Sequence, residues 1–225
     1  MRETHGYWHL HVRGPGWKTG LIRLGVPGLF NVENAACALG LALGLASRDD
    51  RILQPVASDY AGTALREFVG VKRRFELWGM HAGVELVHDF AHHPTEVRAV
   101  IDAARRSMPG KPLHVLFQPH QHSRTARFLD DFVESFEGVE SVVVTDVYGA
   151  RAHIDHQAAG SEELARRLRE KGIDAVAAGD LASSCEVYEQ RLHGGSGALI
   201  LGAGDIDTLR DDLIEKLALR GRPQG

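Results

Sequence analysis

The residues His114-Val115-Leu116-Phe117 form an apolar strand that leads into a helix predicted over Thr125–Phe136. A second apolar strand, Ser141–Thr145, follows that helix. Two buried strands joined through a helix form a βαβ unit, in which the strands run parallel. The same alternation continues on both sides of this stretch. The sequence therefore predicts an α/β fold with an open, mostly parallel sheet and helices on both faces.

The flanking segments repeat this pattern from residue 73 almost to the C-terminus. Pro94 suits the first turn of a helix, where no amide hydrogen is needed. Further strands are predicted over Arg73–Trp78, Val84–Asp89, Ala175–Val176 and Ala198–Leu201. Further helices are predicted over Pro94–Ser107, Ser161–Lys171, Leu181–Leu192 and Ile206–Leu219.

The first 69 residues follow a different pattern. Tyr7–Val12 and Leu21–Leu24 are typical of a hairpin, with turn residues between them. A helix is expected over Asn31–Ala46 and, because it is apolar on most faces, we expect other elements to bury it. A second helix is expected over Asp50–Tyr60. A hairpin and two helices do not make a complete domain, so we interpret residues 1–69 as the end of one domain, 70–72 as a linker and 73–225 as a second domain.

Composition narrows the class of protein. Of the 225 residues, 44% are hydrophobic and 25% are charged, which is typical of a globular protein. The net charge of −4 gives no broad attraction to nucleic acid. Two cysteines cannot form a disulfide framework and suit a reducing compartment. The apolar run Ala35–Ala46 is interrupted by glycines and is predicted to be too short to span a bilayer. With no hydrophobic signal core near Met1, we expect a cytoplasmic protein that binds no membrane.

Four predicted strands end in turns that are rich in histidine, glycine or charged residues. Ligands of open parallel sheets bind beyond the carboxyl ends of the strands, so we expect these turns to meet at one edge. The turns are Asp89–Pro94, Gln118–Thr125, Asp146–Arg151 and Gly202–Asp205.

The histidines of these turns allow two interpretations. With neighbouring aspartates they could bind zinc or manganese, although their spacing is not a regular metal-ligand motif. Alternatively, one of the adjacent pair His92 and His93 caps the following helix and the other is solvated. The candidate metal ligands are His92, His93, His120, His122, His153, His156, Asp89, Asp146 and Asp155.

Arg124 is placed at the start of a predicted helix. A guanidinium and helix amides together suit an anion such as a carboxylate or a phosphate. The alternative is a surface arginine paired with Asp130 or Asp131. Gly202–Asp205 also opens a helix, either as a tight turn or as a ligand contact. The sequence contains no G-x-x-x-x-G-K-[ST] phosphate-binding loop.

Several motifs, in order, resemble the Mur ligase family. Upstream, Gly28-x-x-Asn31-x-x-Asn34-Ala35 and Gly70-Val71-Lys72-Arg73-Arg74-Phe75 resemble the end of its central domain and its inter-domain linker. The resemblance covers nearly the whole chain. It implies a Rossmann-like C-terminal domain preceded by a remnant of a central ATPase domain. The motifs similar to that C-terminal domain are Asp89-Phe90-Ala91-His92-His93-Pro94-Thr95-Glu96, Phe117-Gln118-Pro119-His120-x-x-Ser123-Arg124-Thr125, Thr145-Asp146-Val147-Tyr148 and Gly202-Ala203-Gly204-Asp205-Ile206.

The resemblance implies an ATP-dependent ligase of peptidoglycan precursor synthesis, most similar to members that join L-alanine to UDP-N-acetylmuramate. In that reaction ATP phosphorylates the muramyl carboxylate, the alanine amine attacks the acyl phosphate, and magnesium neutralises the phosphates. The resemblance assigns no metal ligand to this chain. It assigns the amino acid to His92, Arg124, His120 and His93, and ATP to Asn31, Arg74, Asp89 and Asn34, with Asp89 on the ribose hydroxyls.

This sequence departs from the family pattern at Phe30, Gln121 and Phe90, where the family usually has histidine, arginine and tyrosine. It also lacks the P-loop and the UDP-sugar domain. We therefore expect the chain to be active only with a companion chain that carries them. The alternatives are a non-catalytic module that binds a nucleotide or an amino acid, and a metal-dependent phosphoesterase.

Overall fold

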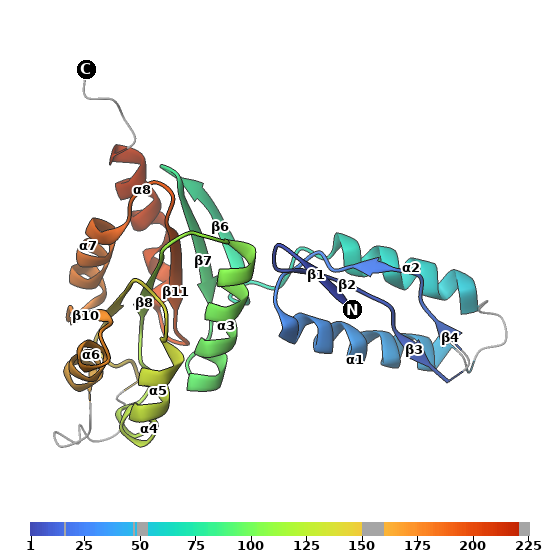
Figure 1. Cartoon of the computed structure of the whole chain (residues 1–225), viewed down its shortest axis with the longest axis horizontal. Helices are drawn as coiled ribbons and strands as arrows, with labels where there is room; N and C mark the ends of the chain where they lie inside the picture. Colours follow the sequence, from blue (N-terminus) through green and yellow to red (C-terminus); the bar gives the residue numbers. More distant parts are fainter. Residues whose placement is uncertain (16, 47, 49–53, 150–159, 221–225) are drawn as a thin grey trace. The chain divides into compact units, whose positions relative to one another are not determined.

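The computed structural model describes residues 1–15, 17–46, 48, 54–149 and 160–220. Its contacts divide the chain into two compact units, each of which is described by itself (Figure 1). The N-terminal unit comprises Met1–Val71 together with Asp102–Pro109, and the C-terminal unit comprises Lys72–Ile101 and Gly110–Gly225. One change of unit falls after Val71, within the expected linker 70–72, and the assignment changes again on either side of Asp102–Pro109, inside the expected domain 73–225.

A six-stranded sheet forms the centre of the C-terminal unit. Its order is β10-β9-β8-β11-β7-β6, and only β6 runs antiparallel to its neighbour. The prediction of an open, mostly parallel α/β sheet is confirmed. The strands are β6 (Glu76–His81), β7 (Val84–Asp89), β8 (Leu113–Phe117), β9 (Ser141–Val144), β10 (Asp174–Ala177) and β11 (Gly197–Leu201).

Helices cover both faces of this sheet (Figure 1). On one face, α7 and α8 share a core with alternate strand residues such as Leu86, Leu116 and Ile200. On the other face, α5 packs Phe132 and Phe136 against Phe117, with ring centroids 5.4 Å apart in both pairs. The helices are α3 (Pro94–Ser107), α4 (His122–Arg127), α5 (Leu129–Ser135), α6 (Ser161–Glu170), α7 (Leu181–Arg191), the 3₁₀ helix η1 (Ile206–Leu209) and α8 (Arg210–Arg220).

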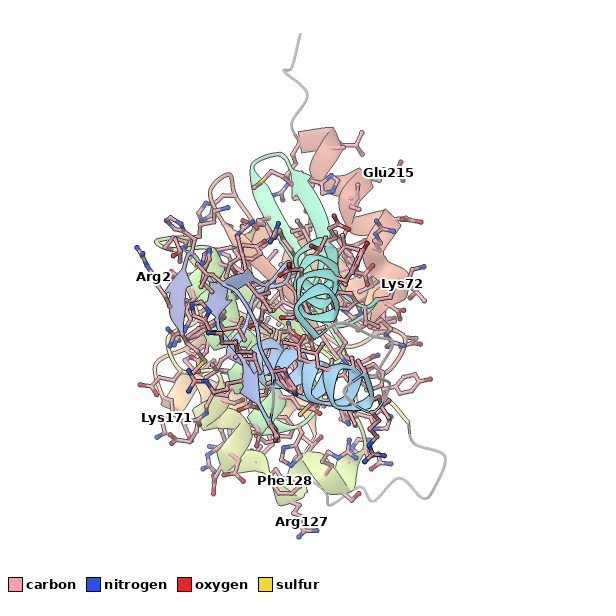
Figure 2. The ribbon with its side chains drawn as sticks, turned by 90° about the vertical axis from the view of Figure 1, so that its right-hand side faces the viewer. Arg2, Lys72, Arg127, Phe128, Lys171 and Glu215 are labelled. Carbon is pink, nitrogen blue, oxygen red and sulfur yellow. The ribbon has the colours of Figure 1, made fainter. Side chains whose placement is uncertain are left out.

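Two predicted helices are divided in the structure. The helix predicted over Thr125–Phe136 consists of α4 and α5, which meet at Phe128 (Figure 2). Phe128 leaves helical geometry, with φ −112° and ψ 25°, and its ring packs against His93 at 4.8 Å. The helix predicted over Ile206–Leu219 begins as η1 and continues as α8. Apolar spacing alone did not reveal either break, because the apolar pattern continues through both.

The N-terminal unit combines short strands with two helices. β2 (Tyr7–Leu10) pairs antiparallel with β5 (Ile22–Arg23), close to the predicted hairpin strands. β1 (Arg2–Thr4) was not predicted and pairs with the other edge of β2. A small hairpin of β3 (Arg13–Gly14) and β4 (Trp17–Lys18) lies between β2 and β5 in the sequence. The helices are α1 (Leu29–Ala46) and α2 (Gln54–Glu67), and α2 runs further than the predicted helix over Asp50–Tyr60.

The prediction that other elements would bury α1 on most faces is wrong. One face is buried, through Val32, Ala35, Leu39 and Leu43, and it packs in a core with the small sheet. The prediction that this stretch is too short for a bilayer is also wrong on length, because the helix starts at Leu29. Within the described residues, α1 meets the length and composition required to cross a membrane, a test that core helices also pass.

Candidate functional site

The loops that follow β7, β8, β9 and β11 lie together at one edge of the sheet. β11 is placed between β7 and β8, so its loop lies between theirs. The amide of Gly202 donates to Asp89 O at 3.1 Å, which joins the loops after β11 and β7. His120 and Tyr148 form an isolated parallel bridge, which joins the loops after β8 and β9. This edge therefore brings together most of the predicted site residues of the C-terminal unit.

The glycine-rich turn after β11 is shaped by a close side-chain contact. A Cβ at Gly204 would lie 2.3 Å from Gln118 Oε1 and 2.5 Å from Tyr148 Cγ. Gln118 is buried, donates to Asp205 Oδ1 at 2.8 Å and accepts from the Ile206 amide at 3.3 Å. Of the two interpretations of this turn, the structure favours tight packing. Gly204 is required by its neighbours without any ligand.

Two histidines from different loops face each other at this edge. The rings of His92 and His120 are 5.8 Å apart, and the ring of Tyr148 is 5.7 Å from that of His120. His92 Nδ1 lies 3.0 Å from Phe90 O and 3.3 Å from a carboxylate oxygen of Glu96. Burial lowers the pKa of His120, and the positive charge of Arg124 lowers it further. His120 is therefore neutral near pH 7.

Arg124 stands beside this pair with unused hydrogen-bonding capacity. Its Nη1 is buried without a hydrogen-bond partner among the described residues, as are the Nδ1 atoms of His120 and His122. The alternative pairing with Asp130 or Asp131 is not found among the described residues, and Asp130 pairs with Arg167 instead. A cation and adjacent donors without acceptors suit an anionic ligand such as a carboxylate.

His93 has a different role from His92. It precedes Pro94 at the start of α3, and its Nδ1 accepts from the Thr95 amide at 3.4 Å. Glu96 reaches back to accept from the amides of His92 and His93, at 3.0 and 3.2 Å. These bonds form a helix-capping arrangement. The structure thus supports the capping interpretation for His93 and does not bring its ring beside His120. Glu96 was missed, although an acidic residue three positions after a cap is a sequence signal.

Asp89 is buried at the end of β7. Its carboxylate binds one backbone amide just before β6 and another just after β7. Its Oδ2 accepts from the Phe75 amide and its Oδ1 from the Ala91 amide, both at 2.7 Å. Burial raises the pKa of the Asp89 carboxyl, and these two bonds oppose the rise. Each oxygen retains a further lone pair for a diol. The ribose role of Asp89 stays a prediction.

Arg73 and Arg74 both lie near the ring of Phe90. Their guanidinium carbons are 4.7 and 5.3 Å from its centroid. Arg73 also donates to Gly204 O at 2.6 Å and lies 3.6 Å from Asp207. Arg73 and Phe75 have φ of 61° and 44°, which side-chain-bearing residues rarely adopt. The predicted ATP residue Arg74 is therefore at the site edge, and sequence reasoning missed the anchoring role of Arg73.

Asn31 and Asn34, the remaining predicted ATP residues, lie on α1 in the N-terminal unit. Asn31 Nδ2 donates to Pro27 O at 2.7 Å, across the turn that precedes α1. Asn34 is exposed and donates to Asn31 Oδ1 at 3.3 Å. The two amides therefore form a small polar pair in the first turns of the helix.

The metal interpretation has no donor set in the described part of the chain. No group of three or more histidine, cysteine, aspartate or glutamate side chains is placed there to hold an ion. His92 and His93 diverge toward different partners, His120 and Phe128. Three of the candidate ligands, His153, Asp155 and His156, lie outside the described residues.

Comparisons with known proteins agree with the motifs. A family model for the Mur ligase, glutamate ligase domain matches residues 73–204. The UDP-N-acetylmuramate–L-alanine ligase of Salinibacter ruber is 39% identical over 204 residues, which cover 90% of this chain and 41% of the relative. The ligase of the same name from Nostoc punctiforme is 37% identical over 202 residues, which cover 88% of this chain and 40% of that relative. This chain thus spans about two fifths of the length of these relatives.

Solved structures show the same fold. The UDP-N-acetylmuramate–alanine ligase of Thermotoga maritima superposes with a TM-score of 0.70 at 24% identity, over 94% of this chain and 45% of that one. A murein peptide ligase of Psychrobacter arcticus gives a TM-score of 0.62 at 21% identity, over 88% of this chain and 39% of that one. With the family model matching more than half of its length, this chain belongs to the Mur ligase family.

Proposed function

We propose that this chain is the C-terminal portion of an ATP-dependent UDP-N-acetylmuramate–L-alanine ligase, in which it presents the amino acid. The observation that carries the proposal is the half-buried Arg124 side chain, whose buried Nη1 atom has no hydrogen-bond partner in the described part of the chain and whose charge acts on His120 of the His92–His120 pair. The relatives named for this reaction are 39% and 37% identical to it. Residues 1–69 would then be the end of a central ATP-binding domain, 70–72 the linker and 73–225 the C-terminal domain.

The chemistry of the cluster fits an α-amino acid. The forked guanidinium of Arg124 matches the carboxylate through two parallel hydrogen bonds. The amino group must lose a proton before it can attack an acyl phosphate. His120 is neutral because burial and the charge of Arg124 lower its pKa, so its imidazole can accept that proton. Holding both ends of the amino acid orients the amine for attack, which is a large part of catalysis in such reactions.

ATP and magnesium would supply the activation of the muramyl carboxylate as an acyl phosphate. On this chain, the amides of Asn31 and Asn34 suit an adenine edge, and Arg74 and Asp89 suit a phosphate and a ribose. The sequence carries no phosphate-binding loop, so we propose that the phosphates and magnesium are held by a P-loop-bearing part of a Mur ligase outside this sequence. Such a protein would act in the cytoplasm on soluble UDP-linked precursors.

The test is amide formation by this chain with that missing part. The Salinibacter ruber ligase, shortened to remove its matched region, is co-expressed with this chain, and the UDP-N-acetylmuramoyl-L-alanine product is measured by chromatography. Arg124→Ala should raise the KM for L-alanine roughly 10- to 100-fold, since a hydrogen bond to a charged group contributes about 1.5–3 kcal/mol. Arg127→Ala is the matched control, because Arg127 is exposed at the end of the same helix, over the ring of Phe128 (Figure 2). A mixture without product, or equal KM values for the two variants, would contradict the proposal.

A second candidate is a non-catalytic module that binds an amino acid. It is favoured by the fact that Arg124, His92 and His120 all belong to the C-terminal unit. Calorimetry of the chain alone with L-alanine separates the two. Binding of L-alanine together with failure to form amide in the co-expressed mixture would select the module.

A further inference from the structure

The Nδ1 atom of His92 lies between two oxygen atoms that can only accept hydrogen bonds. It is 3.0 Å from the carbonyl oxygen of Phe90 and 3.3 Å from Oε2 of Glu96. The same Oε2 accepts from the amides of His92 and His93, at 3.0 and 3.2 Å, so it is not a hydroxyl that could donate to the ring. A lone pair on Nδ1 would be repelled by both oxygens. The hydrogen of the neutral ring is therefore on Nδ1, which leaves the lone pair on Nε2.

This tautomer suits a ligand that carries an amino group. The ring of His92 lies 5.8 Å from that of His120, and the side chain is 22% exposed, so a ligand can reach it. The two nitrogens of an imidazole point in different directions, so Nε2 is turned away from the oxygens that bind Nδ1. Under the proposed function, Nε2 can accept a hydrogen bond from the amino group of L-alanine. The opposite tautomer would present an N–H to an ammonium group, which has no lone pair to accept it.

We propose that Glu96 is a positioning residue of the amino-acid cluster, in which its carboxylate fixes the tautomer of His92 so that Nε2 accepts from the substrate amine. The proposal rests on the proposed function and adds no covalent step to it. Arg124 holds the carboxylate of the amino acid, His92 orients its amine, and His120 takes up the proton that the amine loses. The residue that caps the start of α3 thus also acts on the substrate, through the ring of His92.

Two substitutions separate control of the ring from capping of the helix. Hydrogen bonds to an ionised group are roughly twice as strong as those between neutral groups, so the carboxylate favours the Nδ1–H tautomer more than a neutral oxygen would. Glu96→Gln keeps an oxygen for the two backbone amides and for Nδ1, but it removes the charge. Glu96→Ala removes the cap and the contact with the ring together.

Nuclear magnetic resonance of the imidazole nitrogens measures the tautomer in the chain alone. The chain is labelled with ¹⁵N-histidine and studied at about pH 8, above the ordinary histidine pKa of about 6.5. The sequence has 13 histidines, so the His92 signals are identified by their loss in His92→Asn. In the wild type, Nε2 should have the chemical shift of an unprotonated nitrogen. The ratio of the Nδ1–H to the Nε2–H tautomer should fall about fivefold in Glu96→Gln and about tenfold or more in Glu96→Ala, as expected for weakening or losing a hydrogen bond to a charged group.

Amide formation with the shortened Salinibacter ruber ligase tests whether the tautomer matters for the reaction. Glu96→Ala should lower kcat about tenfold and change the KM for L-alanine less than about threefold, because Arg124 still holds the carboxylate of the substrate. Glu96→Gln should recover part of the lost kcat. Arg124→Ala should act mainly on KM instead.

Glu162→Gln is the matched control for Glu96→Gln. Glu162 is exposed in the first turn of α6, a helix that carries no histidine, so this variant also removes a negative charge from the start of a helix. It should leave kcat and the His92 tautomer unchanged. The two glutamine variants should have similar Tm values, because the oxygen of Gln at position 96 still accepts from the two backbone amides.

Several results would overturn the proposal. These are a hydrogen on Nε2 of His92 in the wild type, a tautomer ratio that both Glu96 variants leave unchanged, and a kcat that Glu96→Ala leaves at the wild-type value. A lower Tm with an unchanged tautomer ratio would assign Glu96 to capping alone. If the tautomer responds as expected but the wild-type mixture forms no amide, the proposed function fails and the control of His92 by Glu96 stands. Amide formation that depends on Arg124 but not on Glu96 would do the reverse.

Discussion

Replacing Gly204 by alanine tests how the candidate site is built. The added methyl group would lie 2.3 Å from Gln118 Oε1 and 2.5 Å from Tyr148 Cγ, both well inside contact distance. Gln118 is buried and held by Asp205 and by the Ile206 amide, so it cannot retreat without breaking those bonds. Tyr148 is 39% exposed and can move, which would separate its ring from His120.

The expected cost follows from overpacking. Forcing a methyl group into a packed site destabilises a protein by about 1–3 kcal/mol, which lowers the Tm of a chain of this size by roughly 2–12 °C. Gly204 does not have a left-handed backbone, so the cost is steric. Thermal and urea unfolding followed by circular dichroism measure it.

Gly20→Ala is the control for this substitution, because Gly20 is exposed outside any helix or strand, a Cβ there meets no atom within 4 Å and its backbone is not left-handed. We expect it to change stability by less than about 0.5 kcal/mol. If Gly204→Ala were as stable as this control, the contacts of Gly204 with Gln118 and Tyr148 would not be those described. Packing at the turn after β11 would then not require a glycine at position 204.

Three further predictions concern stability. Tyr188→Phe should lower the free energy of unfolding in urea by about 1–2 kcal/mol, because the buried hydroxyl donates to His114 O at 2.9 Å and Leu199 O at 3.1 Å. An unchanged urea midpoint would contradict this. Gly40→Ala should stabilise the isolated chain by about 0.5–1 kcal/mol, because a Cβ at this position in α1 would meet no atom within 4 Å, and a lower Tm would show that Gly40 is needed within the chain itself. Burial lowers the pKa of His88 and His114 below the ordinary 6.5, so the unfolded chain binds protons that the folded chain does not, and stability should fall as the pH drops through that value. Urea midpoints at pH 7.5 and 5.5 test the last point, and a midpoint that is equal or higher at pH 5.5 would refute it.

The sheet could be predicted because its strands are short apolar runs that end in polar turns. Val84–Asp89 and the helix Pro94–Ser107 match the structure residue for residue. The break at Phe128 could not be predicted, because it depends on a ring contact with His93 from another part of the chain. The burial of α1 was overestimated for a related reason. Its composition shows that two faces are apolar, but it does not show how many partners the chain supplies.

The candidate site was predicted in outline and differs in detail. Because ligands of open parallel sheets bind beyond the carboxyl ends of the strands, the sequence predicted that the four loops would meet at one edge. The motifs then indicated Arg124, His92 and His120. The separate role of His93 depends on Glu96, whose carboxylate binds two amides of the preceding turn. The contacts of Arg73 with Gly204 and Asp207 join residues more than a hundred positions apart, and no local pattern encodes such a contact.

The bonds of Asp89 and Arg73 tie the first residues of the C-terminal unit to its loops. Asp89 binds the Phe75 amide, the Phe90 amide donates to Arg73 O, and the Arg73 side chain holds the turn after β11. Residues 73–75 are therefore fixed to the loops that carry the candidate site. Gly70, which lies shortly before this segment, has a φ of 98°. The segment that enters the C-terminal unit is thus part of the framework of the candidate site, and a change at Asp89 or Arg73 would reach the loops after β7 and β11 together.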